Sequence, residues 1–304
     1  MTRLLTLVFL ILFSLFPDLT PALHAREGSV AIDGYPFETV SFNPALSLRE
    51  TRLQAQDLSD SAVPECLFCL DYGKLILSDT RHVLSAPLRW GKKEWLVFSL
   101  GAAGVGLATA LDKPVFEFFQ RHPYSTSDRI ADWVQPFGSA YSVGILGLFY
   151  LNGIVFENPK ATAVAQDGLA ASLIGQLLIT PIKHIAGRSR PREHEGASAF
   201  DPFSGNTSFP SGHATQAFVV ASVVSEHYPR RWVQVVSYGI AGLVGYARIV
   251  HNGHFVSDVT AGALIGTAVG KAVVHFNQEK RTGLQVHPII GADLRGLAVA
   301  FSFK

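Results

Sequence analysis

Six apolar stretches, each long enough to form a helix of several turns, follow one another after residue 90. They cover residues 95–111, 139–156, 163–182, 212–227, 232–250 and 259–276. A helix needs about 20 apolar residues to cross the hydrocarbon core of a bilayer, so several stretches are long enough and two are short. The pattern predicts an all-α fold, a bundle of about six helices in a domain over residues 91–280.

Polar residues interrupt or border these stretches at Asp167, Gln176, Glu226 and Lys271. A polar group inside a membrane is costly unless it faces the interior of the protein. We therefore expect these side chains to face the inside of a helical bundle, with the loops between helices gathered at its two ends.

The segments before the helical domain differ from it in character. Arg3, an apolar run over 4–16 and small residues up to Ala25 form the pattern of a secretory signal peptide over residues 1–25. Residues 26–90 are mixed and polar, and we expect an irregular segment packed on the helical domain.

The C-terminal residues 281–304 have the alternation of a strand. Leu297, Val299 and Phe301 alternate with small or polar residues, which is the period of a half-buried strand. With the preceding residues 286–290 they predict a small C-terminal β-hairpin.

Composition narrows the possible partners. The 304 residues are 48% hydrophobic and 16% charged, with a formal net charge of +1. So little charge, with few basic clusters, argues against nucleic-acid binding. Cys66 and Cys69 form a lone CxxC, which predicts a local disulfide or two inert thiols and lacks the second pair that a zinc ribbon needs.

Three short polar segments carry the candidate chemistry. They are KHIAGRSRP at 183–191, PSGH at 210–213 and RIVHNGHFVSD at 248–258. The first ends the third apolar stretch, the second begins the fourth, and the third links the fifth to the sixth. They should therefore meet at one end of the bundle, where their cations, donors and imidazoles suit a tetrahedral oxyanion such as phosphate.

The cations of this set are Lys183, Arg190 and Arg248. A phosphate monoester carries about two negative charges near neutral pH, which guanidinium forks and an ammonium group neutralise. Pro191 cannot continue a helix and disfavours helical geometry before it, so the chain should leave its helix near Gly187 and carry Arg190 on a loop.

The PSGH segment predicts a helix start that binds an anion. Ser211 is an expected N-cap, and Gly212 lets the backbone approach a ligand without a Cβ in the way. The free N–H groups of a helix start and its positive dipole end attract phosphate. His213 would face that phosphate and donate a proton to a departing alkoxide.

His254 and Asp258 are four residues apart, on one face of a helix. A carboxylate that accepts a hydrogen bond from one imidazole nitrogen raises the basicity of the other, so His254 is the expected nucleophile. Each of the three motifs also has a structural alternative to a catalytic role. His254 and Asp258 could form a structural pair, PSGH a simple turn and helix cap, and the cations anchors at the end of a membrane helix. Arg188 and Arg192, which flank Arg190, are expected to be solvated loop charges.

A metal site is not expected beside these motifs. Their neighbouring histidines and carboxylates have no spacing typical of a zinc site; they are His184, Glu193, His194, Glu195 and His251.

The spacings KxxxxxxRP, PSGH and RxxxxxHxxxD resemble those of the type 2 phosphatidic acid phosphatase superfamily, over residues 140–275. That superfamily includes bacterial acid phosphatases and vanadium haloperoxidases. Its third motif usually begins SerArg, whereas this chain has Ala247 before Arg248. The resemblance implies a phosphohistidine on His254, general acid catalysis by His213, and water completing the hydrolysis. No cofactor is expected, because the cationic side chains can neutralise the phosphate without a metal.

These observations predict a metal-independent phosphatase acting on a phosphomonoester or pyrophosphate, with a lipid as the expected carrier of the phosphate; a small soluble ester stays open as the substrate. The alternatives are a vanadium-dependent haloperoxidase and a non-catalytic membrane or binding protein. The presence of both candidate catalytic histidines favours an enzyme over a non-catalytic protein. The signal peptide and the apolar helices favour a phosphatase over a haloperoxidase.

The distribution of charge predicts an exported active site. Arg230 and Arg231 lie in the turn opposite the motifs, so positive-inside bias places that turn in the cytoplasm and the motifs in the periplasm. A cleaved signal peptide would put the mature N-terminus outside, which is incompatible with six full spans and an outward site. Either one stretch does not cross, or the domain is a soluble periplasmic globule; we expect a membrane-associated envelope protein.

Overall fold

The computed structural model describes residues 66–67, 69–122, 125–282, 285–290 and 295–300. The expected signal peptide over 1–25 and the first part of the expected irregular segment lie outside these residues. The helical domain predicted over 91–280 lies almost wholly within them.

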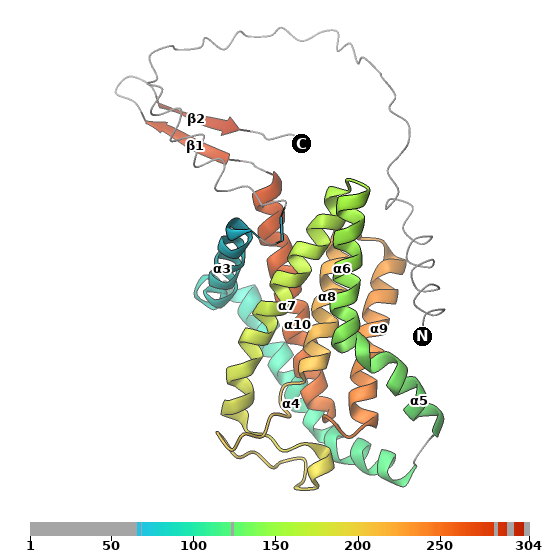
Figure 1. Cartoon of the computed structure of the whole chain (residues 1–304). Helices are drawn as coiled ribbons and strands as arrows, with labels where there is room; N and C mark the ends of the chain where they lie inside the picture. The colour runs from blue at the N-terminus through green and yellow to red at the C-terminus, as the bar shows by residue number, and fades with distance from the viewer. Residues whose placement is uncertain (1–65, 68, 123–124, 283–284, 291–294, 301–304) are drawn as a thin grey trace.

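The described chain folds as a bundle of helices (Figure 1). The elements are α3 (Leu70–Leu84), η2 (Ala86–Arg89), α4 (Lys92–Arg121), α5 (Ser125–Val134), η3 (Gln135–Gly138), α6 (Ala140–Val155), α7 (Pro159–Ala186), η4 (Pro191–Glu193), α8 (Gly212–His227), α9 (Arg231–Val250), α10 (Val256–Thr282), β1 (Gln285–Ile290) and β2 (Arg295–Ala300). Each apolar stretch falls on one of the helices α4 and α6–α10, so the predicted all-α bundle is confirmed. The two strands pair antiparallel, with Val286 opposite Val299, as the predicted hairpin requires.

Helix α8 lies at the centre of the bundle, with α7, α9 and α10 packed around it. Val219 and Val223 of α8 are fully buried beside Ile174 of α7 and Val273 of α10. A central helix with apolar residues on all sides must be covered by other helices, so α8 fixes the positions of its neighbours.

Four of the described helices are long and apolar enough to cross a bilayer: Lys92–Arg121, Pro159–Ala186, Arg231–Val250 and Val256–Arg281. A fifth candidate is the pair Arg129–Gly138 and Ala140–Val155, bent by 54°. Large apolar side chains point outward from these helices, including Leu107 at 76% exposure and Val235 at 72%. A surface of this kind fits lipid better than water, and the protein is membrane-associated.

The polar residues inside the helices fall into two groups. Asp167 is fully buried and accepts hydrogen bonds from Arg281 and from Asn277, as expected for a residue facing the interior. Gln176 is exposed, and Lys271 is half exposed and pairs with Glu226 at 3.2 Å. The expectation that all of them face inward is therefore wrong for Gln176 and Lys271.

The described end of the segment over 26–90 is not irregular. Helix α3 occupies it, with Tyr72, Leu75 and Asp79 buried at helical spacing. Asp79 accepts hydrogen bonds from Asn277 and Lys280 of α10, which fix α3 to the bundle. The sequence pattern did not predict this helix, because its buried face is narrow and includes a carboxylate.

A disulfide joins Cys66 and Cys69 directly before α3. This is the first of the two alternatives that the lone CxxC left open.

Candidate active site

The three polar segments meet at one end of the bundle, at the loop between α7 and α8 and the turn between α9 and α10 (Figure 1). Lys183 Nζ donates to the carbonyl oxygens of Thr207 and Pro210, at 2.8 and 2.7 Å. The Ser211 N–H donates to the carbonyl oxygen of Asp258 at 3.0 Å. Residues far apart in sequence are thus held together by hydrogen bonds to backbone carbonyls, which do not depend on the presence of a ligand.

Helix α7 ends where the sequence predicts. Gly187 has a left-handed φ of 54°, and a Cβ there would stand 1.7 Å from the carbonyl oxygen of Asp201. Only glycine fits that turn, so the chain must leave the helix at this point. It continues in extended geometry through Arg190, whose Nη2 donates to Thr207 Oγ1 at 3.3 Å.

The start of α8 has the predicted N-cap. The Ser211 side chain accepts from the Ala214 N–H at 3.4 Å, and His213 lies half-buried in the first turn. A Cβ added to Gly212 would meet only ordinary contacts, the nearest being Ile179 at 3.6 Å. Packing therefore does not require glycine at 212, and close approach of a ligand stays the predicted reason for it.

Arg248 is buried and held in place from two sides. Its Nη1 donates to Gln135 Oε1 at 2.7 Å, and His251 Nδ1 lies 2.8 Å from the same oxygen. A Cβ on Gly253 would stand 2.4 Å from Arg248 Nη2, so glycine lets the guanidinium lie against the turn. Sequence reasoning missed Gln135, because an isolated glutamine in a loop gives no signal.

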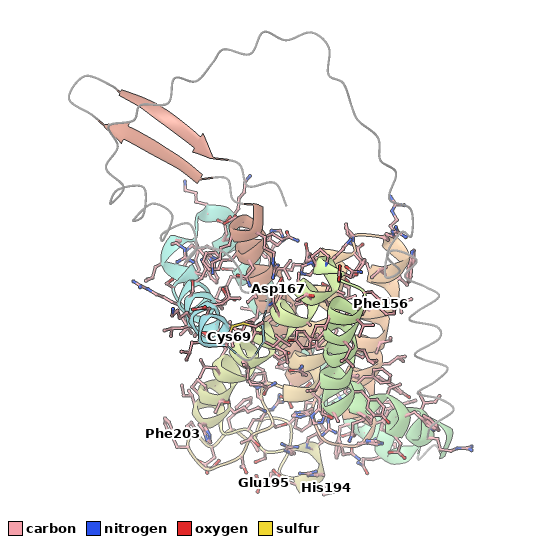
Figure 2. All side chains as sticks on the ribbon, turned by 45° about the horizontal axis from the view of Figure 1, so that its top comes forward. Cys69, Phe156, Asp167, His194, Glu195 and Phe203 are labelled. Atoms are coloured by element: carbon pink, nitrogen blue, oxygen red, sulfur yellow. A yellow bond between two sulfur atoms is a disulfide. The ribbon has the colours of Figure 1, made fainter. Side chains whose placement is uncertain are left out.

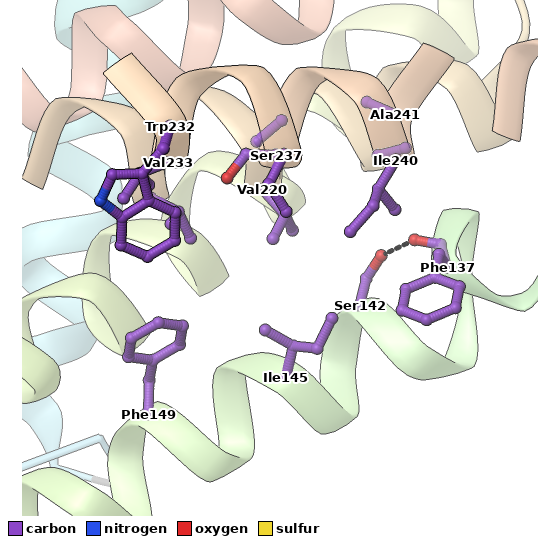
Figure 3. A pocket seen from close by; sticks show the side chains of 14 residues that line it. Phe137, Ser142, Ile145, Phe149, Val220, Trp232, Val233, Ser237, Ile240 and Ala241 are labelled. Atoms are coloured by element: carbon purple, nitrogen blue, oxygen red, sulfur yellow. Dashed lines mark hydrogen bonds between the residues drawn. The ribbon is translucent and has the colours of Figure 1, made fainter. Parts of the chain in front are cut away.

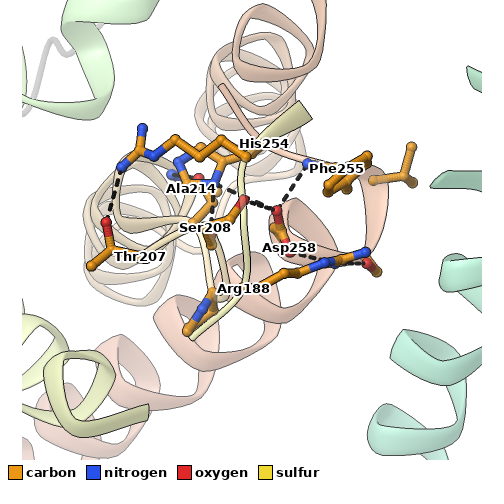
Figure 4. A network of polar contacts seen from close by, with 12 residues as sticks. Arg188, Thr207, Ser208, Ala214, His254, Phe255 and Asp258 are labelled. Carbon is orange, nitrogen blue, oxygen red and sulfur yellow. Dashed lines mark hydrogen bonds and ion pairs between the residues drawn. The ribbon is translucent and has the colours of Figure 1, made fainter. Parts of the chain in front are cut away.

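His254 is almost fully buried, and its ring is oriented by a backbone carbonyl (Figure 4). Nδ1 lies 2.8 Å from the carbonyl oxygen of Ser208 and 3.7 Å from Asp258 Oδ2. The second distance is longer than a hydrogen bond, so the direct bond to Asp258 expected from the sequence is replaced. A carbonyl can only accept, so Nδ1 carries the proton of the neutral ring and Nε2 keeps its lone pair.

Asp258 instead holds the surroundings of that ring. Its Oδ2 accepts from Ser208 Oγ at 2.6 Å and from the Phe255 N–H at 2.9 Å, and its Oδ1 accepts from Arg188 Nη1 at 2.6 Å. The Ser208 hydroxyl donates a hydrogen bond to Asp258, and the Ser208 carbonyl accepts one from His254 Nδ1 (Figure 4). The carboxylate therefore positions Ser208, and Ser208 orients the imidazole.

Arg188 is buried and binds two carboxylates, so the expectation that it is a solvated loop charge is wrong. It is 1% exposed and forms ion pairs with Asp258 at 2.6 Å and with Asp112 of α4 at 2.7 Å. Asp112 also accepts from the Ser257 N–H and hydroxyl, at 2.9 and 2.6 Å. A charged residue inside the apolar helix α4 was the one sequence signal for this network, since such residues need an internal partner.

The environment lowers the pKa of both histidines. Burial lowers the pKa of His254 from 6.5 to about 4, against the opposing effect of Asp258. The pKa of His213 also falls to about 4, first through burial and then through the charge of Arg248. His254 is therefore neutral at ordinary pH, the form that a nucleophile needs, and His213 needs an anion beside it to hold a proton.

Other residues near the motifs have structural roles. Ala247, which stands where the resemblance expects a serine, packs beside Ala131 and Val250 away from the pocket. His194 and Glu195 lie at the motif end of the bundle, and Asp167 lies toward the other end (Figure 2). Among the residues that the structure describes, no three His, Cys, Asp or Glu side chains are grouped as metal ligands.

Comparison with known proteins gives a family match over the part of the chain that carries the motifs. Residues 168–282, which include all three motifs, match the PAP2 superfamily. A lipid A 1-phosphatase of Rhizobium etli is 28% identical over 197 residues, which are 59% of this chain and 82% of that protein. A lipid A 1-phosphatase of Porphyromonas gingivalis is 36% identical over 110 residues, but this match spans only 22% of its length and 36% of this chain.

Two solved structures are similar at lower identity. LpxE of Aquifex aeolicus is 24% identical with a TM-score of 0.44, over 54% of this chain and 95% of that one. A transmembrane PAP2 type phosphatidylglycerolphosphate phosphatase of Bacillus subtilis is 23% identical with a TM-score of 0.48, over 61% of this chain and 94% of that one. The resemblance to this superfamily that the three motifs predicted is thus confirmed for residues 168–282, the part of the chain that carries all three motifs.

Proposed function

We propose that the protein is a metal-independent lipid phosphatase that cleaves a phosphomonoester or pyrophosphate through a phosphohistidine on His254. The observation that carries the proposal is the ring of His254, whose Nδ1 donates to a carbonyl while its other nitrogen stays available beside the motif cations. The alternative, a vanadium-dependent haloperoxidase, has the same residue types but is not favoured by the phosphatase relatives.

The reaction follows from the positions of these groups. Nε2 of His254 attacks phosphorus, the bond to the leaving oxygen breaks, and that oxygen takes a proton from His213. Lys183, Arg190 and Arg248 neutralise the charge that builds up on the phosphoryl oxygens. Water then attacks the phosphohistidine and gives a proton to His213, and cleavage of the P–N bond releases phosphate and restores His254.

A phosphorylated lipid is the proposed substrate class. Two observations support it: four candidate spans with apolar surfaces, and lipid A phosphatases among the relatives. Lipid A carrying a 1-phosphate is therefore the first substrate to test. Phosphatidate, phosphatidylglycerol phosphate and undecaprenyl pyrophosphate form the rest of the panel.

Release of inorganic phosphate from this panel by the purified full chain tests the function. We expect turnover of at least one lipid, retained in EDTA and inhibited by vanadate, because the pocket's own cations stabilise the transition state. Activity that EDTA abolishes and magnesium restores would contradict the metal-independent mechanism. Release of phosphate from none of these lipids or from p-nitrophenyl phosphate would overturn the assignment as a phosphatase.

Replacing each histidine by alanine should separate the nucleophile from the acid. His254→Ala should abolish turnover and the acid-labile phosphoenzyme. His213→Ala should lose about 10²–10⁴-fold on alkyl phosphates, which need a proton on the leaving oxygen, and far less on p-nitrophenyl phosphate. Equal losses on both substrates in the two variants would reject this division of roles.

The pH profile is a second readout of the same roles. His254 must be neutral, so activity should fall as the pH drops toward about 4 instead of toward 6.5. His213 must be protonated, so activity should also fall as the pH rises through the pKa that bound phosphate gives it. The alkaline fall should be steep with an alkyl phosphate and shallow with p-nitrophenyl phosphate, and the activity that His213→Ala retains should not show it.

Arg188 is proposed as a positioning residue. It never needs to touch substrate, because its two ion pairs hold Asp258 and Asp112 in place behind Ser208 and His254. Removal of one partner of a buried ion pair costs about 3–5 kcal/mol, so alanine at 188 would remove a large part of the roughly 5–15 kcal/mol by which an ordinary protein is stable and would confuse loss of activity with loss of fold.

Arg188→Lys gives the sharper test, because it keeps the charge and loses the guanidinium fork. Losing one charged hydrogen bond that orders the site corresponds to about tenfold in kcat. Arg192→Lys, an exposed arginine on the same loop, is the matched control and should behave as the wild type. Equal kcat in the two variants would show that Arg188 does not position the site.

The active site is proposed to face the periplasm. The turn with Arg230 and Arg231 lies at the end opposite the motifs and carries the charge typical of a cytoplasmic loop. A reporter enzyme active only in the periplasm should be active when fused within 195–205 and inactive when fused at Arg230. Activity at both points would indicate a soluble periplasmic domain, and inactivity within 195–205 would reverse the orientation.

A further inference from the structure

An apolar groove runs along the side of the bundle between α6 and α9, with α8 as its floor (Figure 3). Phe149 and Ile145 of α6 face Trp232 and Ile240 of α9 across it. The lining is apolar except for Ser142 and Ser237, and the Ser142 hydroxyl donates to the Phe137 carbonyl. The groove thus offers little to a polar ligand and a long surface to a hydrocarbon chain.

The floor of this groove continues the face of α8 that carries His213. Ala217, Val220 and Val224 line the groove and follow His213 by four, seven and eleven residues. These are the spacings of a single helical face. A molecule that extends from His213 along this face of α8 would pass η3 and reach the groove.

The turn η3 joins the groove to the pocket of cations. Gln135 accepts the hydrogen bond from Arg248 at 2.7 Å, while Phe137, two residues on, lines the groove. Between the groove and the site, Gly138 lies against His213: a Cβ there would stand 2.9 Å from the histidine Cβ. One short element therefore contacts the phosphate-binding residues with one end and the groove with the other.

We propose that the groove holds the hydrocarbon chain of the lipid that leaves the phosphoryl group. This inference rests on the proposed function. His213 gives its proton to the leaving oxygen, and that oxygen belongs to the lipid, so the lipid lies on the His213 side of the phosphorus. His254 and the buried Arg188 network occupy the opposite side. A cationic pocket beside an apolar groove is complementary to an amphiphile with a phosphate at one end.

Inhibition of p-nitrophenyl phosphate hydrolysis by alkylphosphonates tests this occupant. Hexadecylphosphonate and methylphosphonate share the headgroup and differ in the chain. Val236→Trp places a large ring in the groove, at a position 47% exposed, and Val235→Trp is the matched control, adjacent on α9, 72% exposed and outside the groove. Ile240→Trp, also in the groove, serves if the first variant does not fold.

We expect Val236→Trp to raise the Ki of hexadecylphosphonate about tenfold relative to the Ki of methylphosphonate, the equivalent of about two methylene groups losing burial. Val235→Trp should leave this ratio unchanged. Equal ratios in the groove variants and the control would overturn the inference, and would assign the groove to bulk bilayer lipid or to a helix of another protein. Absence of p-nitrophenyl phosphate hydrolysis in the wild type would instead reject the phosphatase function itself.

Discussion

The ion pairs of Arg188 with Asp112 and Asp258 are the constraint on which the active site depends. Three charged groups, each at most 1% exposed, share one guanidinium between two carboxylates. Burial of this kind costs least when the polar atoms have partners. Ser208, Ser257 and the Phe255 N–H supply them for the carboxylates, while Arg188 Nε has none among the described residues. The network therefore fixes the positions of α4, the α7–α8 loop and the start of α10 relative to one another.

That arrangement explains how a loop of irregular backbone can carry precise chemistry. The loop after α7 is fixed by Arg188 on one side and by Lys183 bonding two of its carbonyls on the other. His254 then receives its orientation from Ser208 in the same loop. The proposed nucleophile is thus oriented by the Ser208 carbonyl, and the position of Ser208 is set by the buried carboxylate of Asp258. The imidazole nitrogen that faces away from this carbonyl is the one that the proposed reaction uses.

The sequence predicted the helices well and the polar contacts poorly. Long apolar stretches have one physical solution, and the end of α7 at Gly187 and the cap at Ser211 follow from local backbone chemistry. The bond between His254 and Asp258 did not follow from their spacing, because a neighbouring carbonyl competes for Nδ1. Which donor or acceptor wins depends on the loop from 187 to 210, whose path is set by contacts distant in sequence.

In the proposed function, helix α8 links binding of the phosphate to binding of the rest of the substrate. Its N-terminus supplies the N–H groups and His213, and the same face continues as the floor of the groove. Since α7, α9 and α10 pack around the helix, it cannot rotate to change the angle between these two surfaces. A substrate that fills both must therefore present its leaving oxygen to His213 and its phosphorus to His254 in a single geometry, which is the condition for in-line transfer.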